Sequence, residues 1–158
     1  LQTELEQMIS LVPYDRNCLD HSWKWLSDPE IRELTMTPEF TREQQISFFE
    51  SLPHREGYSI WGVAFNEQLI GAAGLKNQRA AIAEYWTYIG EREFWGKGHG
   101  RHIFKSVEEK ARLMGLTSLE MKVTKENARS IALHASLGFV LDPATEGDAV
   151  LRMVKGKL

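Results

Sequence analysis

The chain has 158 residues, of which 42% are hydrophobic and 26% charged, as in an ordinary folded domain rather than a disordered chain. Its formal charge of −3, from 22 acidic and 19 basic residues, gives no general electrostatic attraction to nucleic acid or to an anionic membrane. The single cysteine, Cys18, excludes an internal disulfide and a thiolate metal cluster.

The length fits one domain, residues 1–158, that buries a single core. No apolar run approaches the about 20 residues that span a bilayer, and the first ten residues lack the pattern of a signal peptide. A cytoplasmic protein without nucleic-acid or membrane partners is therefore expected.

The N-terminal third is predicted to hold one strand and three helices. The strand is expected to end near Val12, before the turn residues Pro-Tyr-Asp. Apolar residues at helical spacing predict two short helices between residues 17 and 34, separated at Asp28 and Pro29, because proline fits a first helical turn. Thr41 is a favoured N-cap for the third helix.

Three strand-like runs follow, at residues 58–65, 68–76 and 80–90. The connections at residues 66–67 and 77–79 are short enough for hairpins. These runs predict a meander of antiparallel strands.

The last part of the chain alternates helices and strands. Helical spacing of Ile103, Val107, Ala111 and Met114 predicts a helix that Gly115 ends. A strand at residues 116–124 and a short helix stopped by Gly138 come next, and two more strands are expected at residues 139–143 and 149–155. The crossover from Glu84 to Val123 is long enough to make its two strands parallel neighbours.

Three alternate glycines, Gly96, Gly98 and Gly100, lie at the entrance to the first of these helices. Glycines reach unusual backbone conformations, and a following helix points its N–H donors and its positive dipole end at one place, which suits phosphate. A tight strand-to-helix turn is the alternative interpretation. A P-loop is excluded because Lys97 is followed by glycine, and the preceding meander disfavours a dinucleotide-binding fold.

The segment WGKGHG, residues 95–100, resembles the phosphate loop of the GCN5-related N-acetyltransferase (GNAT) superfamily. The segment NARSIALHASLGF, residues 127–139, resembles the family's helix that an asparagine opens and Gly-Phe follows. The resemblance covers nearly the whole chain and is greatest to the branch of ribosomal-protein N-terminal, amino-sugar and spermidine acetyltransferases. It implies an α+β three-layer fold, in which about four helices flank a mixed, mostly antiparallel sheet of about seven strands. Its fourth and fifth strands would form a splayed parallel pair.

The resemblance also implies acetyl-CoA as the co-substrate and no metal. Backbone amides of residues 96–101 would hold the pyrophosphate, with His99 contributing its amide rather than its ring. Trp95 replaces the usual Arg or Gln, so Lys97 or Arg101 would supply the positive charge. The main chain near Ile89 and Gly90 would pair with pantetheine. The Asn127 side chain would bond to pantetheine or to the CoA backbone, with Ser130 assisting. The expected cofactor-binding residues are Ile89, Gly90, Trp95, Gly96, Lys97, Gly98, His99, Gly100, Arg101, Asn127 and Ser130.

Two residues are candidates for catalysis. In the family, a carboxylate on the fourth strand, or a water that it holds, often removes the amine proton, and Glu84 among aromatic and apolar neighbours matches it. His134 stands where the family often has a tyrosine acid, on one helix face with Asn127 and Ser130, and it could protonate the CoA sulfur. A solvated strand-face glutamate and a packing histidine are the alternatives.

The acceptor is expected to be a primary amine that receives the acetyl group directly in a ternary complex. A small molecule such as an amino sugar is favoured, and the alternatives are a protein N-terminus or a non-catalytic acyl-CoA-binding sensor. The chain would act as a monomer or homodimer. An acidic residue, Glu33, is a candidate for attracting a cationic amine. Aromatic residues that could line the acceptor pocket, or pack in the core, are Trp23, Trp25, Phe40, Tyr85, Trp86 and Tyr88.

Overall fold

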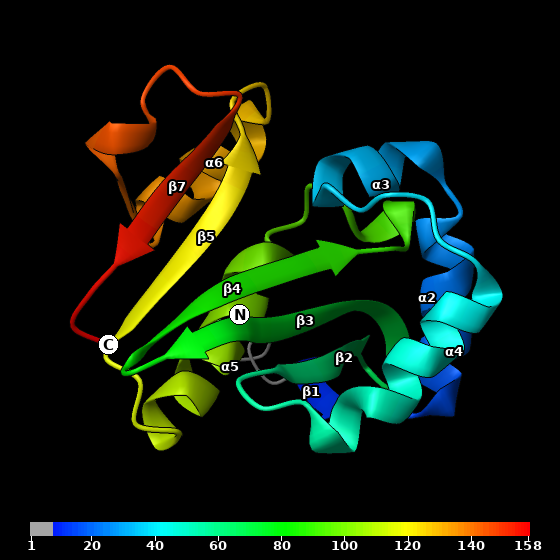
Figure 1. The fold of residues 1–158 in the computed structure, drawn as a ribbon. Coiled ribbons are helices and arrows are strands. Elements are labelled where there is room, and N and C mark those ends of the chain that lie inside the picture. Colours follow the sequence, from blue (N-terminus) through cyan, green and yellow to red (C-terminus); the bar gives the residue numbers. More distant parts are fainter. Residues whose placement is uncertain (1–7) are drawn as a thin grey trace.

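A computed structural model of the chain describes residues 8–158, and its centre is a seven-stranded sheet in the order β1-β2-β3-β4-β5-β7-β6 (Figure 1). Only β4 and β5 are parallel neighbours, which confirms the predicted mixed sheet. The strands are β1 (Ile9–Pro13), β2 (Ser59–Phe65), β3 (Gln68–Arg79), β4 (Ile82–Ile89), β5 (Ser118–Thr124), β6 (Val140–Leu141) and β7 (Val150–Lys155). The first strand, predicted to end near Val12, ends at Pro13, and any part of it before residue 8 lies outside the described residues.

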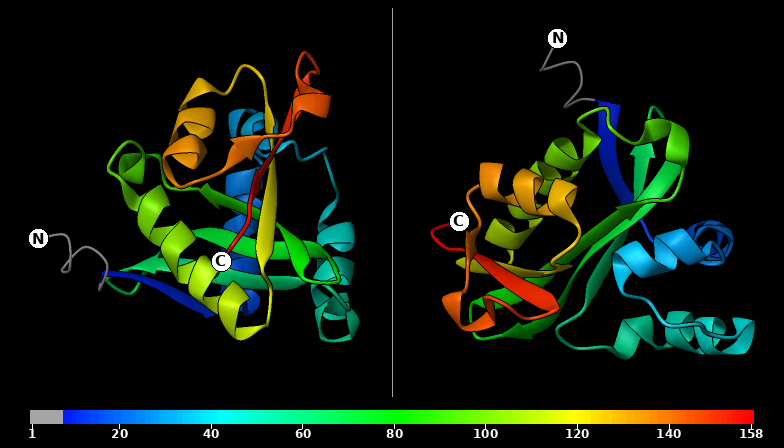
Figure 2. Two further views of the ribbon diagram at one scale, coloured as in Figure 1. Left: turned by 90° about the vertical axis from the view of Figure 1, so that its left-hand side faces the viewer. Right: turned by 90° about the horizontal axis from the view of Figure 1, so that it is seen from above.

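Helices cover both faces of the sheet, which gives three layers (Figure 2). One face carries the three N-terminal helices and the other carries the two later ones, so the described residues hold the five α-helices predicted along the chain, where the resemblance implied about four. No helix within residues 8–158 is both long and apolar enough to cross a membrane. The helices are α2 (Arg16–Leu26), α3 (Pro29–Thr35), α4 (Arg42–Ser51), α5 (His99–Leu113) and α6 (Ala128–Ser136), with short 3-10 turns at Leu52–His54, Arg92–Phe94 and Pro143–Thr145.

Local capping explains where the N-terminal helices begin. The Asp15 side chain accepts a hydrogen bond from the Cys18 amide at 3.0 Å and caps α2, and Asp28 caps α3, where Pro29 occupies the first turn. The Thr41 side chain caps α4 in a reciprocal capping box. The predicted break at Asp28 and Pro29 and the predicted cap at Thr41 are confirmed.

The connection between β3 and β4 differs from its prediction. Residues 77–79 were expected to form the hairpin loop, but they continue β3, and the chain turns at Ala80 and Ala81. The strand pairing shifts between Lys76 and Arg79, and Asn77 takes the left-handed φ of 52° that asparagine tolerates. The irregularity therefore lies inside the strand instead of ending it.

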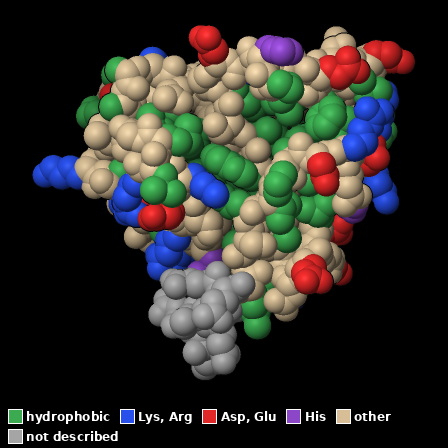
Figure 3. Space-filling view, turned by 90° about the horizontal axis from the view of Figure 1, so that it is seen from below, with side chains coloured by type: hydrophobic (Ala, Val, Ile, Leu, Met, Phe, Trp, Pro, Cys, Tyr) green, Lys and Arg blue, Asp and Glu red, His purple; other side chains and the backbone are tan. Residues whose placement is uncertain are grey.

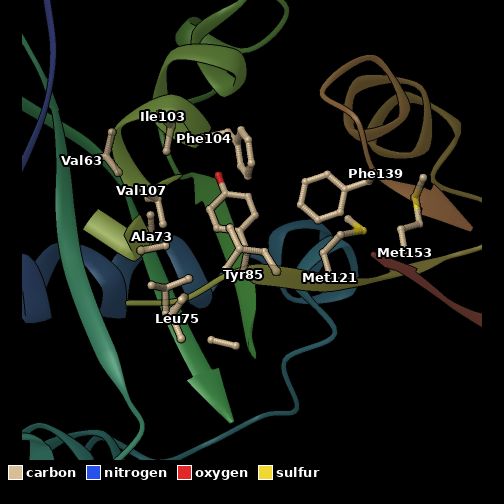
Figure 4. Packing of buried hydrophobic residues seen from close by; sticks show 14 of the residues in the cluster. Val63, Ala73, Leu75, Tyr85, Ile103, Phe104, Val107, Met121, Phe139 and Met153 are labelled. Atoms are coloured by element: carbon tan, nitrogen blue, oxygen red, sulfur yellow. The ribbon is translucent and has the colours of Figure 1, made fainter. Parts of the chain in front are cut away.

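The core lies between the sheet and the helices α5 and α6 (Figure 4). Ile103, Val107 and Ala111 of α5 are fully buried, as their spacing predicted. Met114 was predicted on the same face but is 40% exposed, because it follows the last turn of α5 as the C-cap. Figure 4 shows Tyr85 of β4 pointing toward α5, so this core continues beneath the parallel pair.

The two parallel strands separate soon after they begin. β4 and β5 pair only at residues 82–84 with 118–120, and beyond Glu84 and Glu120 they diverge (Figure 1). The other edge of β5 pairs with β7 along residues 119–124. The predicted splay is confirmed, and it opens an edge on β4 that faces no strand.

The far edge of the sheet is β1. The view from below (Figure 3) looks onto this side, where hydrophobic side chains gather along the middle and several lysine and arginine side chains lie on the left. Leu11 of β1 borders a shallow hollow there with His102 and Lys105 of α5. This hollow lies outside the opening between β4 and β5.

Candidate active site

A cleft of about 1050 Å³ extends from the helices α2–α4 across the sheet to the splay, the glycine loop and α6. Its lining includes every predicted cofactor-binding residue except Gly90 and Lys97, as well as both predicted catalytic residues. We call one half of the cleft the acceptor half, after the acceptor expected from the sequence; its lining comes from side chains within residues 14–60 and from Lys76, Glu84, Trp86, Tyr88 and Lys122 of the sheet. We call the rest of the cleft, around the glycine loop and α6, the cofactor half, after the cofactor expected from the sequence.

The three glycines serve two different needs. Gly96 and Gly98 have φ values of 72° and 82°, in the left-handed region that disfavours other residues, although a Cβ at Gly98 would meet nothing within 4 Å. Gly100 is helical, and a Cβ there would lie 2.9 Å from Cδ2 of Leu133 on α6. Two glycines therefore shape the loop, and the third lets α6 approach α5.

The first turn of α5 offers uncapped N–H donors to the cleft. Its N-cap is Gly98, no side chain caps it, and its first turn holds no acidic residue. The His99 ring is buried and lies 4.8 Å from the Phe65 ring and 5.8 Å from the Phe94 ring, measured between centroids. Burial lowers the pKa of His99, with smaller contributions from His102 and Lys97. The ring thus packs in the protein and leaves the amide to the loop, as expected from the sequence.

Three cationic side chains surround this loop. The Lys97 ammonium lies 5.8 Å from the Phe94 ring centroid, and Arg101 donates to the Ser136 hydroxyl at 2.9 Å. Arg129 of α6 lines the cleft with its guanidinium beside Gly96. Sequence reasoning missed Arg129, because only the tertiary fold brings α6 against the loop.

The end of β4 presents its backbone to the splay. The Gly90 amide donates to the Ile70 carbonyl at 2.7 Å, so Gly90 faces β3. Successive residues of a strand face opposite neighbours, and the Ile89 carbonyl does point the other way, where it accepts from the Trp95 indole at 2.7 Å. The Ile89 amide, on the same side as its carbonyl, therefore faces the cleft.

Gly90 has a packing role that the sequence did not reveal. A Cβ at this position would lie 2.1 Å from the Trp25 ring of α2. The Trp25 indole in turn donates to the Glu91 carboxylate at 2.9 Å. Close contact between α2 and the end of β4 explains this glycine.

Three side chains of α6 share one face, as predicted. The Asn127 side chain accepts from the Ser130 amide at 3.2 Å and caps the helix. The His134 Nδ1 lies 2.7 Å from the Ser130 carbonyl, so it carries the proton and leaves Nε2 as the second ring nitrogen. Burial lowers the pKa of His134, although the bond to Ser130 acts in the opposite direction.

Glu84 is buried, but its surroundings are more polar than its sequence neighbours indicated. Asn77 donates to one carboxylate oxygen at 3.0 Å. The ammonium groups of Lys76 and Lys122 lie 3.7 and 3.6 Å from the carboxylate. Glu84 therefore sits between cations supplied by the strands on either side.

Apart from Lys76, Glu84 and Lys122, the side chains that line the acceptor half are uncharged, and many of them are aromatic. Of the predicted lining, Trp23 and Trp25 pack elsewhere, since Trp23 contacts Phe40 and Trp25 contacts Gly90. Glu33 is exposed and does not line the cleft. No three histidine, cysteine, aspartate or glutamate side chains within residues 8–158 are grouped as metal ligands. The aromatic residues that line this half are Tyr14, Phe40, Phe48, Tyr58, Trp86 and Tyr88.

Comparison with known proteins identifies this arrangement. The model of the acetyltransferase (GNAT) domain family matches residues 9–140. The chain belongs to this family. The prediction from the two motifs is confirmed, and no curated protein matches the sequence significantly.

Solved structures share the GNAT fold of this chain. A domain from Methanocaldococcus jannaschii is 23% identical, with a TM-score of 0.83 over 94% of this chain and 97% of the other. Spermidine N-acetyltransferase from Vibrio cholerae, solved with CoA and spermine, is 18% identical, with a TM-score of 0.85 over 96% of both chains. Campylobacter jejuni PseH in complex with acetyl coenzyme A is 18% identical, with a TM-score of 0.71 over 95% of this chain and 99% of the other.

Proposed function

We propose that this GNAT domain transfers an acetyl group from acetyl-CoA to the primary amine of a small molecule, within a ternary complex. The observation that carries the proposal is that the uncapped start of α5 and the splay between β4 and β5 open into one cleft. Helix N-termini bind phosphate, and an open strand edge pairs with an extended amide chain. The residues present therefore fit the two polar parts of CoA.

In this proposal the amides of residues 96–101 hold the pyrophosphate. Lys97, Arg101 and Arg129 supply positive charge around the loop. The pantetheine arm follows β4, where the Ile89 amide is the donor that faces it, because Gly90 is bonded to β3 and the Ile89 carbonyl to Trp95. The Asn127 side chain still has its NH₂ group to donate, since its oxygen caps α6.

Acetyl-CoA supplies an activated acetyl group, and the protein has to orient the amine and move protons. The amine nitrogen bonds to the acetyl carbon, the carbon–sulfur bond breaks, and the products are the amide and the CoA thiol. We assign removal of the amine proton to Glu84, which lies where the strands begin to splay. His134 is assigned the proton transfer to the sulfur: because its Nδ1 proton stays bonded to the Ser130 carbonyl, Nε2 first takes up a proton released by the attacking amine and then gives that proton to the leaving thiolate.

An amino sugar is the proposed kind of acceptor. Aromatic side chains line the acceptor half, and the Trp86 and Tyr88 rings are stacked at 17° with centroids 6.3 Å apart. Ring faces of this kind suit the apolar faces of a cyclic acceptor. A protein N-terminus and a sensor without turnover are the competing outcomes of the test.

Calorimetric titration with acetyl-CoA tests the cofactor site, using Gly98→Asp and Gly147→Asp as a matched pair. Both glycines have positive φ values, 82° and 89°, and neither would place a Cβ within 4 Å of another residue. Only Gly98→Asp puts a negative charge in the proposed phosphate loop. We expect it to weaken acetyl-CoA binding by about tenfold or more, while Gly147→Asp binds like the wild type.

A screen for free-thiol release against amino sugars, polyamines and N-terminal peptides then tests the transfer. Release with an amino sugar supports the proposed acceptor, and release with peptides alone supports the alternative. Binding without release from any amine would indicate a sensor. If both glycine variants bind acetyl-CoA with the affinity of the wild type, the glycine loop is not the phosphate site.

A further inference from the structure

The acceptor half of the cleft contains an ion cluster formed by three neighbouring strands. Lys76 of β3, Glu84 of β4 and Lys122 of β5 lie side by side, with nitrogen–oxygen distances of 3.7 and 3.6 Å. The glutamate side chain is 7% exposed, whereas those of the lysines are 40% and 46% exposed. The carboxylate is thus enclosed, and the ammonium groups reach the solvent.

This cluster contains all the charge in the acceptor half. The lining side chains from residues 14–60 are apolar, hydroxyl or amide groups, with no acid and no base among them. Burial raises the pKa of Tyr14 and of Tyr58 to about 12, so both phenols are neutral. Two ammonium groups and one carboxylate leave this half of the cleft with a net positive charge.

The cluster also lies near the place of transfer. Glu84 is the last residue of β4 paired with β5, and the phosphate loop follows the other end of β4. Ile89 lies five positions after Glu84, which is about 17 Å of strand at about 3.3 Å per residue. An extended arm that starts at the loop and follows β4 therefore carries its reactive end toward this cluster.

We infer that the acceptor carries an anionic group, a carboxylate or a phosphate, beside its amine, and that Lys76 and Lys122 bind this group. The inference rests on the proposed function and specifies its substrate class. The aromatic residues hold the body of the acceptor, and the two ammonium groups select its charge. A polyamine would bring further positive charge to a site that is already positive and offers it no unpaired carboxylate.

Anion binding also changes what Glu84 can do. In the structure described here, both carboxylate oxygens face donors. A carboxylate or phosphate on the acceptor competes with Glu84 for the two ammonium groups. The correct acceptor thus frees the carboxylate to take up the amine proton at the moment when the amine is in place.

Matched acceptors test the inference. Thiol release is compared between glucosamine and glucosamine 6-phosphate and between phenethylamine and phenylalanine, with spermidine as the polycation. Each pair has a similar amine and differs in one phosphate or carboxylate, so the two pairs also distinguish the source of the negative charge. We expect the anionic member of at least one pair to have a kcat/KM about tenfold higher or more.

The variant Lys76→Met/Lys122→Met is expected to lose this preference while acetyl-CoA affinity is unchanged. Lys24→Met, an exposed lysine on α2 outside the cleft, is the matched control and keeps the preference. The inference is overturned if spermidine or the members without the anionic group react best, or if the double variant discriminates like the wild type. Calorimetric binding of the same pairs to the CoA complex makes the comparison without turnover, so a failure of anion recognition is distinguishable from a failure of catalysis.

Discussion

Asn127 has two hydrogen-bonding ends, and the fold uses one of them. Its side-chain oxygen caps α6 through the Ser130 amide, and the NH₂ group is assigned to pantetheine. Asn127→Asp keeps the capping oxygen but removes the donor, whereas Asn127→Ala removes both. We expect Asn127→Ala to lower the free energy of unfolding by about 1 kcal/mol, and Asn127→Asp to leave it nearly unchanged.

Acetyl-CoA affinity should follow the other end of the same side chain. Both variants are expected to bind acetyl-CoA more weakly, by about tenfold, because both lack the NH₂ donor. Urea denaturation and calorimetry on the same preparations measure the two properties. Wild-type affinity in Asn127→Asp would mean that Asn127 serves only as a helix cap.

His134 makes stability depend on pH in a direction that its environment determines. Burial lowers the pKa of His134 in the folded state. As the pH falls, His134 therefore takes up its proton earlier in the unfolded chain, at about pH 6.5, than in the folded protein. The stability contributed by the neutral ring is therefore present above that pH and is lost as the pH falls toward the folded pKa. The free energy of unfolding should decrease from about pH 7.5 to about pH 5.5, with a slope of at most about 1.4 kcal/mol per pH unit from this group.

His134→Gln isolates this contribution, because glutamine does not titrate. His99 has a pKa lowered in the same direction, but it is present in both proteins and cancels in the difference. Urea denaturation at three pH values should show a steeper loss for the wild type than for the variant. Parallel curves would contradict the assignment of a lowered pKa to His134.

At the scale of elements, the segment from the end of β4 to the start of α5 connects the two halves of the cleft. Arg92 lies 4.9 Å from the Trp95 ring centroid and binds Asp28 at 2.5 Å and Glu30 at 2.8 Å. Trp95 bonds to the strand edge at the Ile89 carbonyl. The helix α3, which lines the acceptor half of the cleft, is thus joined through this segment to the backbone assigned to the cofactor.

Elements whose ends depend on local chemistry were predictable from the sequence. Thr41 caps a helix and Gly115 ends another through interactions within a few residues, so a single sequence shows them. The glycine loop was predictable for the same reason. The continuation of β3 through Asn77 was missed, because that side chain is held by Glu84 on the next strand.

The site was predictable where one segment forms it and not where several meet. The residues that surround Glu84 and the glycine loop, namely Lys76, Lys122 and Arg129, come from other strands and from α6. Nothing in their own sequence surroundings marks them. The sequence neighbours of Glu84 predicted an apolar environment, but the adjacent strands place two lysine side chains beside its carboxylate.

At the scale of the whole molecule, the sheet has two parts, β1–β4 and β5–β7, that join through only three residue pairs of the parallel strands. A ligand in the splay contacts both parts and binds only the folded chain, so it should stabilise the whole domain. Acetyl-CoA at about 100 times its Kd is expected to raise the free energy of unfolding by about 2.7 kcal/mol. Gly98→Asp should reduce this gain at the same concentration.

Hydrogen exchange separates a bond in the splay from this general stabilisation. Adjacent amides provide the comparison, because Gly90 is already bonded to the Ile70 carbonyl at 2.7 Å while the Ile89 amide faces the cleft. Global stabilisation slows exchange at both positions, and a new bond to pantetheine adds protection at Ile89 alone. We expect acetyl-CoA to slow exchange more at Ile89 than at Gly90. Equal slowing at the two amides would show that the ligand stabilises the fold without pairing with β4.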